Sequence, residues 1–256
     1  AASLEEAFDL YKLSMHAGDT VLIKGTKKEP IETIIRTFHE SITSTLCQIN
    51  LAAIEHNIKI LRKKIPPATR MMVMVKAFAY GTDAFRIAKF LSTCGIDIIG
   101  VSYVEEGIAL KKAGVDQSIF VLNAADYEVQ QLVKWDLEIG VSTKELIEHI
   151  AHEATLQKKK IKVHLHVDTG MSRFGCRQED ALSLAQLITQ HPSLELEGVM
   201  THFAAADDPG QDAFTFSQAG SLHTVIAELK KAGIDPKWKH AANSAAVLRF
   251  SFPEFN

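Results

Sequence analysis

The sequence Met71-Met72-Val73-Met74-Val75-Lys76-Ala77-Phe78-Ala79-Tyr80-Gly81 sets a pattern that the rest of the chain repeats. A short apolar run that ends in a tyrosine-glycine turn is typical of a strand buried on both faces. Lys76 closes this strand, where an unpaired ammonium group would be costly to bury. Such a lysine either extends its alkyl stem toward solvent or loses its proton and becomes a nucleophile for carbonyl groups. This stretch alone leaves both interpretations open.

Outward from this stretch, strands and helices alternate. A helix over residues 51–64, which Asn50 could cap, comes first. The expected strands span residues 71–76, 96–102, 118–122, 137–141, 161–168, 194–202 and 238–243. The helices between them are expected at residues 83–93, 104–113, 126–134, 143–157, 179–190 and 214–232, and one more helix follows the last strand. Repeated units of this kind favour a (β/α)8 TIM-type barrel over a doubly wound sheet.

Seven of the eight strands of such a barrel are visible in the sequence. We therefore expect an α/β barrel truncated before its eighth strand, and a chain that is a fragment of a longer protein. Residues 1–43 have a different pattern, with helices expected over residues 4–17 and 31–39 and a short strand between them. This pattern predicts two domains: a short α/β remnant at residues 1–43 and the incomplete barrel at residues 44–256.

The composition narrows the class of partner. Hydrophobic residues make up 46% of the 256 residues and charged residues 23%, which is ordinary for a globular protein. A net charge of −3 gives no reason to expect nucleic acid or an anionic membrane as partner. No apolar run is long enough to cross a bilayer, and the N-terminus lacks a signal-peptide pattern. The three scattered cysteines favour a reducing, cytoplasmic location.

The functional residues of a barrel of this type are expected at the carboxyl ends of its strands. A lysine, an arginine, a histidine and two hydroxyl groups are predicted to converge there. This set suits an aldehyde cofactor that carries a phosphate, with Lys76 for the aldehyde and Tyr80 and Ser244 for the phosphate. The residues that carry this prediction are Lys76, Tyr80, Arg173, His202, Asn243 and Ser244.

A second interpretation comes from another class of enzyme. His164, His166 and Asp168 alternate along one strand and so share a face, and His202 could join them as a zinc ligand in a metal-dependent hydrolase. Two histidines on a strand more often pack and hydrogen-bond than bind metal, and His164 lies early in its strand. Glu105 and Glu106 receive a plainer interpretation, as carboxylates that favour the start of a helix.

Four ordered motifs resemble those of alanine racemase, over the chain from about residue 44 to its end. They are Val75-Lys76-Ala77-Phe78-Ala79-Tyr80-Gly81, His166-Val167-Asp168-Thr169-Gly170-Met171-Ser172-Arg173-Phe174-Gly175, Gly198-Val199-Met200-Thr201-His202-Phe203-Ala204 and Asn243-Ser244-Ala245-Ala246. The resemblance implies a homodimer of two-domain subunits, each with a barrel that holds pyridoxal 5′-phosphate. It also implies interconversion of L- and D-alanine for peptidoglycan synthesis.

The resemblance also implies a role for each site residue. Lys76 would form the internal aldimine and act as the base on one face of the substrate. Tyr80 and Ser244 would hold the cofactor phosphate, and Asn243 would shape the phosphate end. Arg173 would hydrogen-bond near the phenolic oxygen, and His202 would support an arginine that faces the pyridine nitrogen. The first motif departs from the family at Phe78, where asparagine is common, and at Thr82-Asp83, where His-Gly is common.

The resemblance leaves part of the chemistry outside the sequence. The second catalytic base, a tyrosine of the partner subunit, and the pyridine-facing arginine would lie beyond Asn256, so the fragment alone is expected not to racemise alanine. Residues 18–25 are similar to the end of the Mur ligase that adds D-alanyl-D-alanine, which predicts a ligase–racemase fusion. A non-catalytic barrel that only binds pyridoxal 5′-phosphate remains the alternative function.

Overall fold

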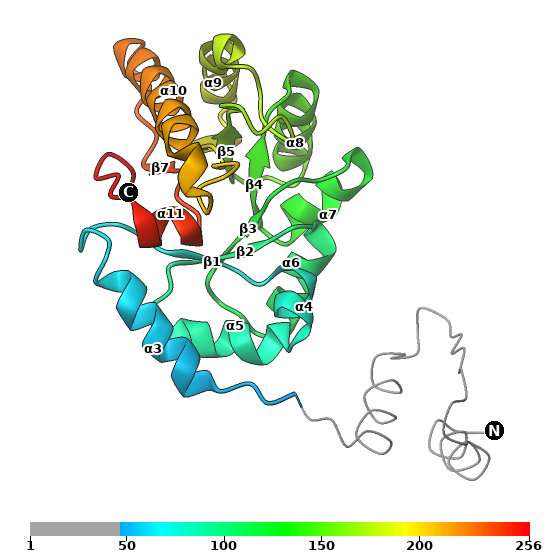
Figure 1. Ribbon diagram of the computed structural model, residues 1–256. Coiled ribbons are helices and arrows are strands. Elements are labelled where there is room, and N and C mark those ends of the chain that lie inside the picture. Colours follow the sequence, from blue (N-terminus) through cyan, green and yellow to red (C-terminus); the bar gives the residue numbers. More distant parts are fainter. Residues whose placement is uncertain (1–46) are drawn as a thin grey trace, which may run out of the picture. The chain divides into compact units, whose positions relative to one another are not determined.

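The computed structural model describes residues 47–256, and within them the strands form one parallel sheet. The strand order follows the chain from β1 to β7, and each strand pairs with the next. The sheet curls as part of a barrel, with the helices on its outer side (Figure 1). The strands are β1 (Met72–Met74), β2 (Ile98–Val101), β3 (Ser118–Val121), β4 (Glu138–Val141), β5 (Ile161–His166), β6 (Leu194–Met200) and β7 (Trp238–His240). This confirms the predicted truncated (β/α) barrel. The α/β remnant expected at residues 1–43 lies outside the described residues.

The predicted helices are also present, some with short 3₁₀ turns in front of them. They are α3 (Leu51–Arg62), α5 (Ala84–Thr93), α6 (Val104–Lys112), η1 (Asp126–Glu128), α7 (Val129–Lys134), α8 (Lys144–Leu156), η2 (Gln178–Asp180), α9 (Ala181–Gln190), η3 (Pro209–Gln211), α10 (Asp212–Lys231) and α11 (Ser244–Arg249). Asn50 caps α3 as predicted, because its side chain accepts a hydrogen bond from Ala53 N.

Several strands end earlier than expected, and in the fifth strand the last expected residue turns to a loop partner. Asp168, for example, was expected to end the fifth strand, but its N–H donates to Cys176 O at 2.8 Å instead of continuing the ladder. The polar residues at the carboxyl ends therefore belong to loops rather than to strands.

Two apolar layers hold the sheet. The outer layer lies between the sheet and the helices, with strand residues such as Ile99, Val121 and Val163 fully buried. The inner layer lies inside the barrel, where Ile98, Phe120 and Met200 pack together with the partly buried Met72 and Leu122. Close-packed burial of this kind supplies most of the stability of a fold. The strands therefore position the site from a rigid base.

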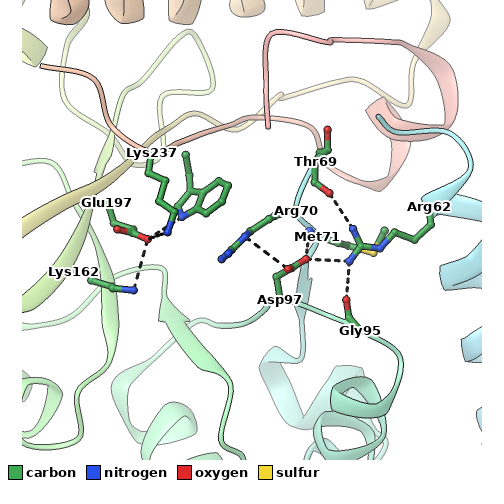
Figure 2. Close-up of polar contacts among 10 residues, drawn as sticks. Arg62, Thr69, Arg70, Met71, Gly95, Asp97, Lys162, Glu197 and Lys237 are labelled. Atoms are coloured by element: carbon green, nitrogen blue, oxygen red, sulfur yellow. Dashed lines mark hydrogen bonds and ion pairs between the residues drawn. The ribbon is translucent and has the colours of Figure 1, made fainter. Parts of the chain in front are cut away.

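Charged side chains join the strands near their amino ends (Figure 2). Asp97 Oδ2 lies 3.0 Å from Arg62 Nη2 and accepts the N–H of Met71 at 3.0 Å. Glu197 Oε1 accepts the Trp238 indole N–H at 2.9 Å and lies 3.6 Å from Lys162 Nζ and 3.5 Å from Lys237 Nζ.

The two edge strands also meet at this amino end. The Arg70 guanidinium, just before β1, lies 4.1 Å from the centre of the Trp238 ring on β7 and also pairs with Asp97 at 3.7 Å. A cation over an aromatic face is attracted by the ring quadrupole. Arg70 therefore ties β7 to the segment that leads into β1.

Candidate active site

Lys76 lies just beyond β1, after the buried Val75, and is itself half-buried. It opens the segment labelled α4 (Lys76–Gly81), which is a left-handed turn: φ lies at 51° for Ala77, 55° for Phe78, 52° for Ala79 and 59° for Tyr80. The expected strand to Lys76 is therefore wrong at its end. Left-handed backbone costs a non-glycine residue about 1–2 kcal/mol. Neighbouring groups must hold this turn.

Glu106 on α6 supplies part of that hold. One carboxylate oxygen accepts the N–H of Ala77 at 2.6 Å, and the other accepts the N–H of Ser102 at 2.8 Å and of Tyr103 at 3.3 Å. The sequence interpretation of Glu106 as a favourable charge at a helix start missed this contact. Its position at the third residue of a helix is the signal of a capping box, but that signal predicts the local bonds and not the one to Ala77.

The loop after β5 carries Arg173 and is closed by backbone bonds. Asp168 Oδ1 accepts the N–H groups of Gly170 at 2.9 Å and Ser172 at 3.0 Å, and Cys176 N donates to His166 O at 2.8 Å. Gly175 has φ +111°, and a Cβ at this position would lie only 2.4 Å from Asp168 N, so the loop needs glycine here. This tight turn presents the exposed Arg173 at the carboxyl end of the barrel.

The charges of Lys76 and Arg173 act together on His202, just beyond β6. Burial lowers the pKa of His202 below 6.5, and the positive charges of Arg173 and Lys76 lower it further. Burial, His202 and Arg173 lower the pKa of His166 to about 4, against the opposing charge of Asp168. His166, Arg173 and His202 line one pocket. The structure therefore brings Arg173 and His202 together in one pocket, and Lys76 is near enough for its charge to act on His202, which is neutral at pH 7.

Asn243 and Ser244 lie beyond β7, at the start of α11. Asn243 Oδ1 accepts the N–H of Ala246 at 3.0 Å, and its Nδ2 donates to Phe203 O at 3.2 Å. Asn243 thus joins the start of α11 to the loop after β6. Ser244 is exposed, as is Tyr80 in the left-handed turn. Both hydroxyl groups are open to a ligand at the carboxyl end of the barrel.

His164 and His240 lie inside the barrel rather than at its carboxyl end. His164 Nε2 lies 3.1 Å from Glu138 Oε2, and its Nδ1 lies 3.0 Å from His240 Nε2. Both ring nitrogens of the fully buried His164 are therefore engaged. Among residues 47–256, no group of three or more histidine, cysteine, aspartate or glutamate residues is placed to hold a metal ion. The ligand set expected for a zinc hydrolase does not form in this part of the chain.

The fold and the site together define a class of protein. The barrel presents a lysine, an arginine, a neutral histidine and two open hydroxyl groups at the carboxyl ends of β1, β5, β6 and β7. This donor set fits a phosphorylated aldehyde such as pyridoxal 5′-phosphate. The lysine amine matches the aldehyde, the arginine can donate to the phenolic oxygen, and the hydroxyl groups can donate to the phosphate. The class is that of pyridoxal-phosphate barrels.

The chain belongs to the family described as alanine racemase, N-terminal domain, whose sequence profile matches residues 49–256. Members of this family use pyridoxal 5′-phosphate as cofactor. Alanine racemase of Treponema denticola is 37% identical over 216 residues, which cover 83% of this chain and 57% of that protein. Alanine racemase of Geobacillus kaustophilus is 37% identical over 214 residues, or 83% of this chain and 54% of that protein.

Solved structures of alanine racemases share the fold. The enzyme from D-cycloserine producing Streptomyces lavendulae superposes with a TM-score of 0.75 at 28% identity, over 81% of this chain and 54% of that one. The Bacillus anthracis enzyme with bound L-Ala-P gives a TM-score of 0.74 at 32% identity, over 80% and 53%. The chain thus spans about half the length of the relatives it matches. Within residues 47–256, no helix is both long and apolar enough to cross a membrane.

Proposed function

We propose that this chain is part of an enzyme that interconverts L-alanine and D-alanine with pyridoxal 5′-phosphate. The observation that carries the proposal is that the positive charges of Arg173 and Lys76 both act on the buried His202 at the carboxyl end of the barrel. The relatives named alanine racemase support it. The solved structure with bound L-Ala-P supports alanine as the substrate.

Each site residue has a role in this proposal. The cofactor, when bound, supplies an electron sink that makes the α-proton of the amino acid acidic. Lys76 Nζ holds the aldehyde end and moves the α-proton on one face of the substrate. The hydroxyls of Tyr80 and Ser244 bind the phosphate, and Asn243 fixes the position of Ser244 through its cap. Arg173 donates a hydrogen bond to the phenolic oxygen.

His202 has a neutral ring in this proposal. Because burial and the charges of Arg173 and Lys76 keep its pKa low, it can hydrogen-bond to an arginine without repelling it. That arginine would be the group that faces the pyridine nitrogen.

Racemisation needs a second group for the opposite face of the substrate. Among the described residues, Lys76 is the group to which we assign proton transfer. The proposal therefore includes a second base from the partner subunit of a homodimer. It predicts that residues 1–256 alone do not racemise alanine.

The wider setting rests on the sequence alone. We infer that residues 1–43 are the end of a Mur-ligase-like domain fused ahead of the racemase barrel at residues 44–256. The same inference places the enzyme in the cytoplasm and assigns its D-alanine to peptidoglycan synthesis.

The test compares D-alanine formation by the 256-residue chain and by the longest natural chain that contains it. The long chain should racemise alanine with added pyridoxal 5′-phosphate, and the 256-residue chain should not. Cofactor binding without turnover by the long chain would favour the non-catalytic carrier. Rapid turnover by the 256-residue chain would refute the need for a second base from outside it.

A matched pair of variants tests the lysine. Lys76→Ala in the long chain should abolish both D-alanine formation and the visible absorbance band of the bound cofactor. Lys89→Ala, which changes an exposed lysine of α5, should leave both unchanged. A Lys76→Ala variant that keeps its absorbance band would exclude Lys76 as the cofactor lysine.

A further inference from the structure

Gln218 on α10 is a fully buried amide that reaches two loops of the site. Its Oε1 accepts the N–H of Ala204 at 3.0 Å. Its Nε2 donates to His202 O at 3.2 Å and to Thr169 Oγ1 at 3.3 Å. One side chain therefore joins the loop after β5 to the loop after β6.

A pair of buried threonines continues this connection. The hydroxyls of Thr169 and Thr201 lie 2.8 Å apart, and both residues are almost fully buried. Thr169 lies in the same tight loop as Arg173, and Thr201 directly precedes His202. The contact therefore links the arginine loop to the histidine through a second bond.

The loop after β6 is held at three consecutive residues. Gln218 bonds the carbonyl of His202 and the N–H of Ala204, and Asn243 donates to the carbonyl of Phe203 at 3.2 Å. The helix also lies against the loop after β5, because a Cβ on Gly170 would come within 2.9 Å of the Phe214 ring. α10 thus contacts both loops closely.

Burial alone does not explain these bonds. A buried amide needs hydrogen-bond partners, but it could find them within its own helix or the nearest strand. Thr215, three residues earlier on α10 and equally buried, has a hydroxyl with no hydrogen-bond partner among the described residues. The bonds of Gln218 go to the loops that carry Arg173 and His202.

We propose that Gln218 is a positioning residue that fixes the Arg173 loop and His202 relative to each other. It touches neither substrate nor cofactor and acts through Thr169 and the backbone of His202 and Ala204. Groups that bind a ligand need such support, because small displacements of a site weaken it strongly. The part of this inference that concerns the cofactor rests on the proposed function.

The first test needs no cofactor. The pKa of His202 is measured by NMR titration in the 256-residue chain, in Gln218→Met and in the control Thr215→Val. Gln218→Met keeps the size of the side chain and removes its hydrogen bonds. We expect the pKa of His202 to rise toward 6.5 in Gln218→Met, because Arg173 and the burying loops are no longer held against it. Thr215→Val should leave it unchanged.

The second test measures the affinity for pyridoxal 5′-phosphate by absorbance titration of the same proteins. Gln218→Met should raise the dissociation constant about tenfold, the equivalent of one well-placed hydrogen bond. Thr215→Val should not raise it. Failure of both the unmodified chain and the longest natural chain that contains it to bind the cofactor would refute the proposed function, while the His202 titration would still decide the role of Gln218.

A further variant keeps the proposal testable should Gln218→Met fail to fold. Thr169→Val removes the bonds of Thr169 to Gln218 and Thr201 and leaves the bond from Ala204 to Gln218 in place. It should shift the pKa of His202 in the same direction. The opposing result is a variant, Gln218→Met or Thr169→Val, that folds with a lower free energy of unfolding but keeps the pKa of His202 and the cofactor affinity unchanged. That result would show that Gln218 is structural only.

Discussion

At the scale of single residues, two backbone conformations shape the site. Gly175 allows the arginine loop to lie against Asp168, and the left-handed turn from Ala77 to Tyr80 directs the chain beyond Lys76. The first uses glycine, which tolerates the conformation, and the second uses residues that do not. Replacing Gly175 should therefore lower the stability of the fold, whereas replacing a residue of the left-handed turn with one that tolerates this backbone should raise it.

Gly175→Ala should lower the free energy of unfolding by about 2–3 kcal/mol, because the new Cβ would meet backbone atoms that cannot move away. The control is Gly233→Ala, which has φ +78° but no atom within 4 Å of the added Cβ. It should cost about 1 kcal/mol from backbone strain alone. Urea unfolding measures both, and equal effects would contradict a close approach at Gly175.

Phe78→Asn should raise the free energy of unfolding by about 1 kcal/mol, because asparagine tolerates left-handed backbone better than phenylalanine. Phe78 is 57% exposed, so little packing is lost. The control Phe216→Asn changes a similarly exposed phenylalanine, 53%, in the right-handed helix α10 and should not stabilise. Thermal unfolding compares them. A lower stability of Phe78→Asn would mean that the turn is not left-handed in solution.

At the scale of elements, α6 supports the lysine turn through one carboxylate. Glu106 accepts three backbone N–H groups with its two oxygens, and one of those groups belongs to Ala77. A carboxylate is an acceptor at both oxygens, whereas an amide would place a donor against one set of N–H groups.

Glu106→Gln should therefore loosen the turn beyond Lys76. Hydrogen exchange at the Ala77 amide should become faster, and the affinity for pyridoxal 5′-phosphate should fall. The neighbouring Glu105→Gln is the control, because Glu105 is exposed on the same helix. If the Ala77 amide exchanges at the same rate in both variants, Glu106 does not hold the turn.

The elements themselves could be predicted from the sequence, but their irregular parts could not. Apolar runs such as residues 71–75, with glycines at helix ends such as Gly114, indicate strand and helix locally. The left-handed turn has no such signal, because Ala77, Phe78 and Ala79 are ordinary residues. The contacts of Gln218 depend on loops that meet only in the folded chain. The roles of Lys76, Tyr80, Arg173, His202, Asn243 and Ser244 stay predictions, although the fold places each at the carboxyl end of the barrel.

At the scale of the whole molecule, neutral histidines make the stability depend on pH. Burial lowers the pKa of His166 to about 4, and burial followed by the nearby His164 and His166 lowers that of His240 well below 6.5. Glu138 has its pKa lowered by His164 and Lys162 despite the opposing effect of burial. The two histidines therefore bind protons more weakly in the folded chain than in the unfolded chain.

The free energy of unfolding should fall as the pH drops from about 6.5 toward 4. In that window the unfolded chain binds more protons than the folded chain, and His166 alone accounts for roughly 3 kcal/mol at pH 4. The contribution of Glu138 is lost only below its ordinary pKa of 4.5. Urea unfolding from pH 8 to pH 4.5 measures the slope. His166→Gln should flatten it, and a stability that is constant from pH 7 to pH 5 would contradict the prediction.

The cluster around Asp97 and Trp238 has a consequence for protein engineering. Its ion pairs lie near the amino ends of the strands (Figure 2), whereas Lys76, Arg173 and His202 lie beyond their carboxyl ends. Substitutions in this cluster therefore change positions at the opposite end of the barrel from the candidate site. A library that randomises the neighbours of Asp97 can be screened for durability alone, without changing Lys76, Arg173 or His202.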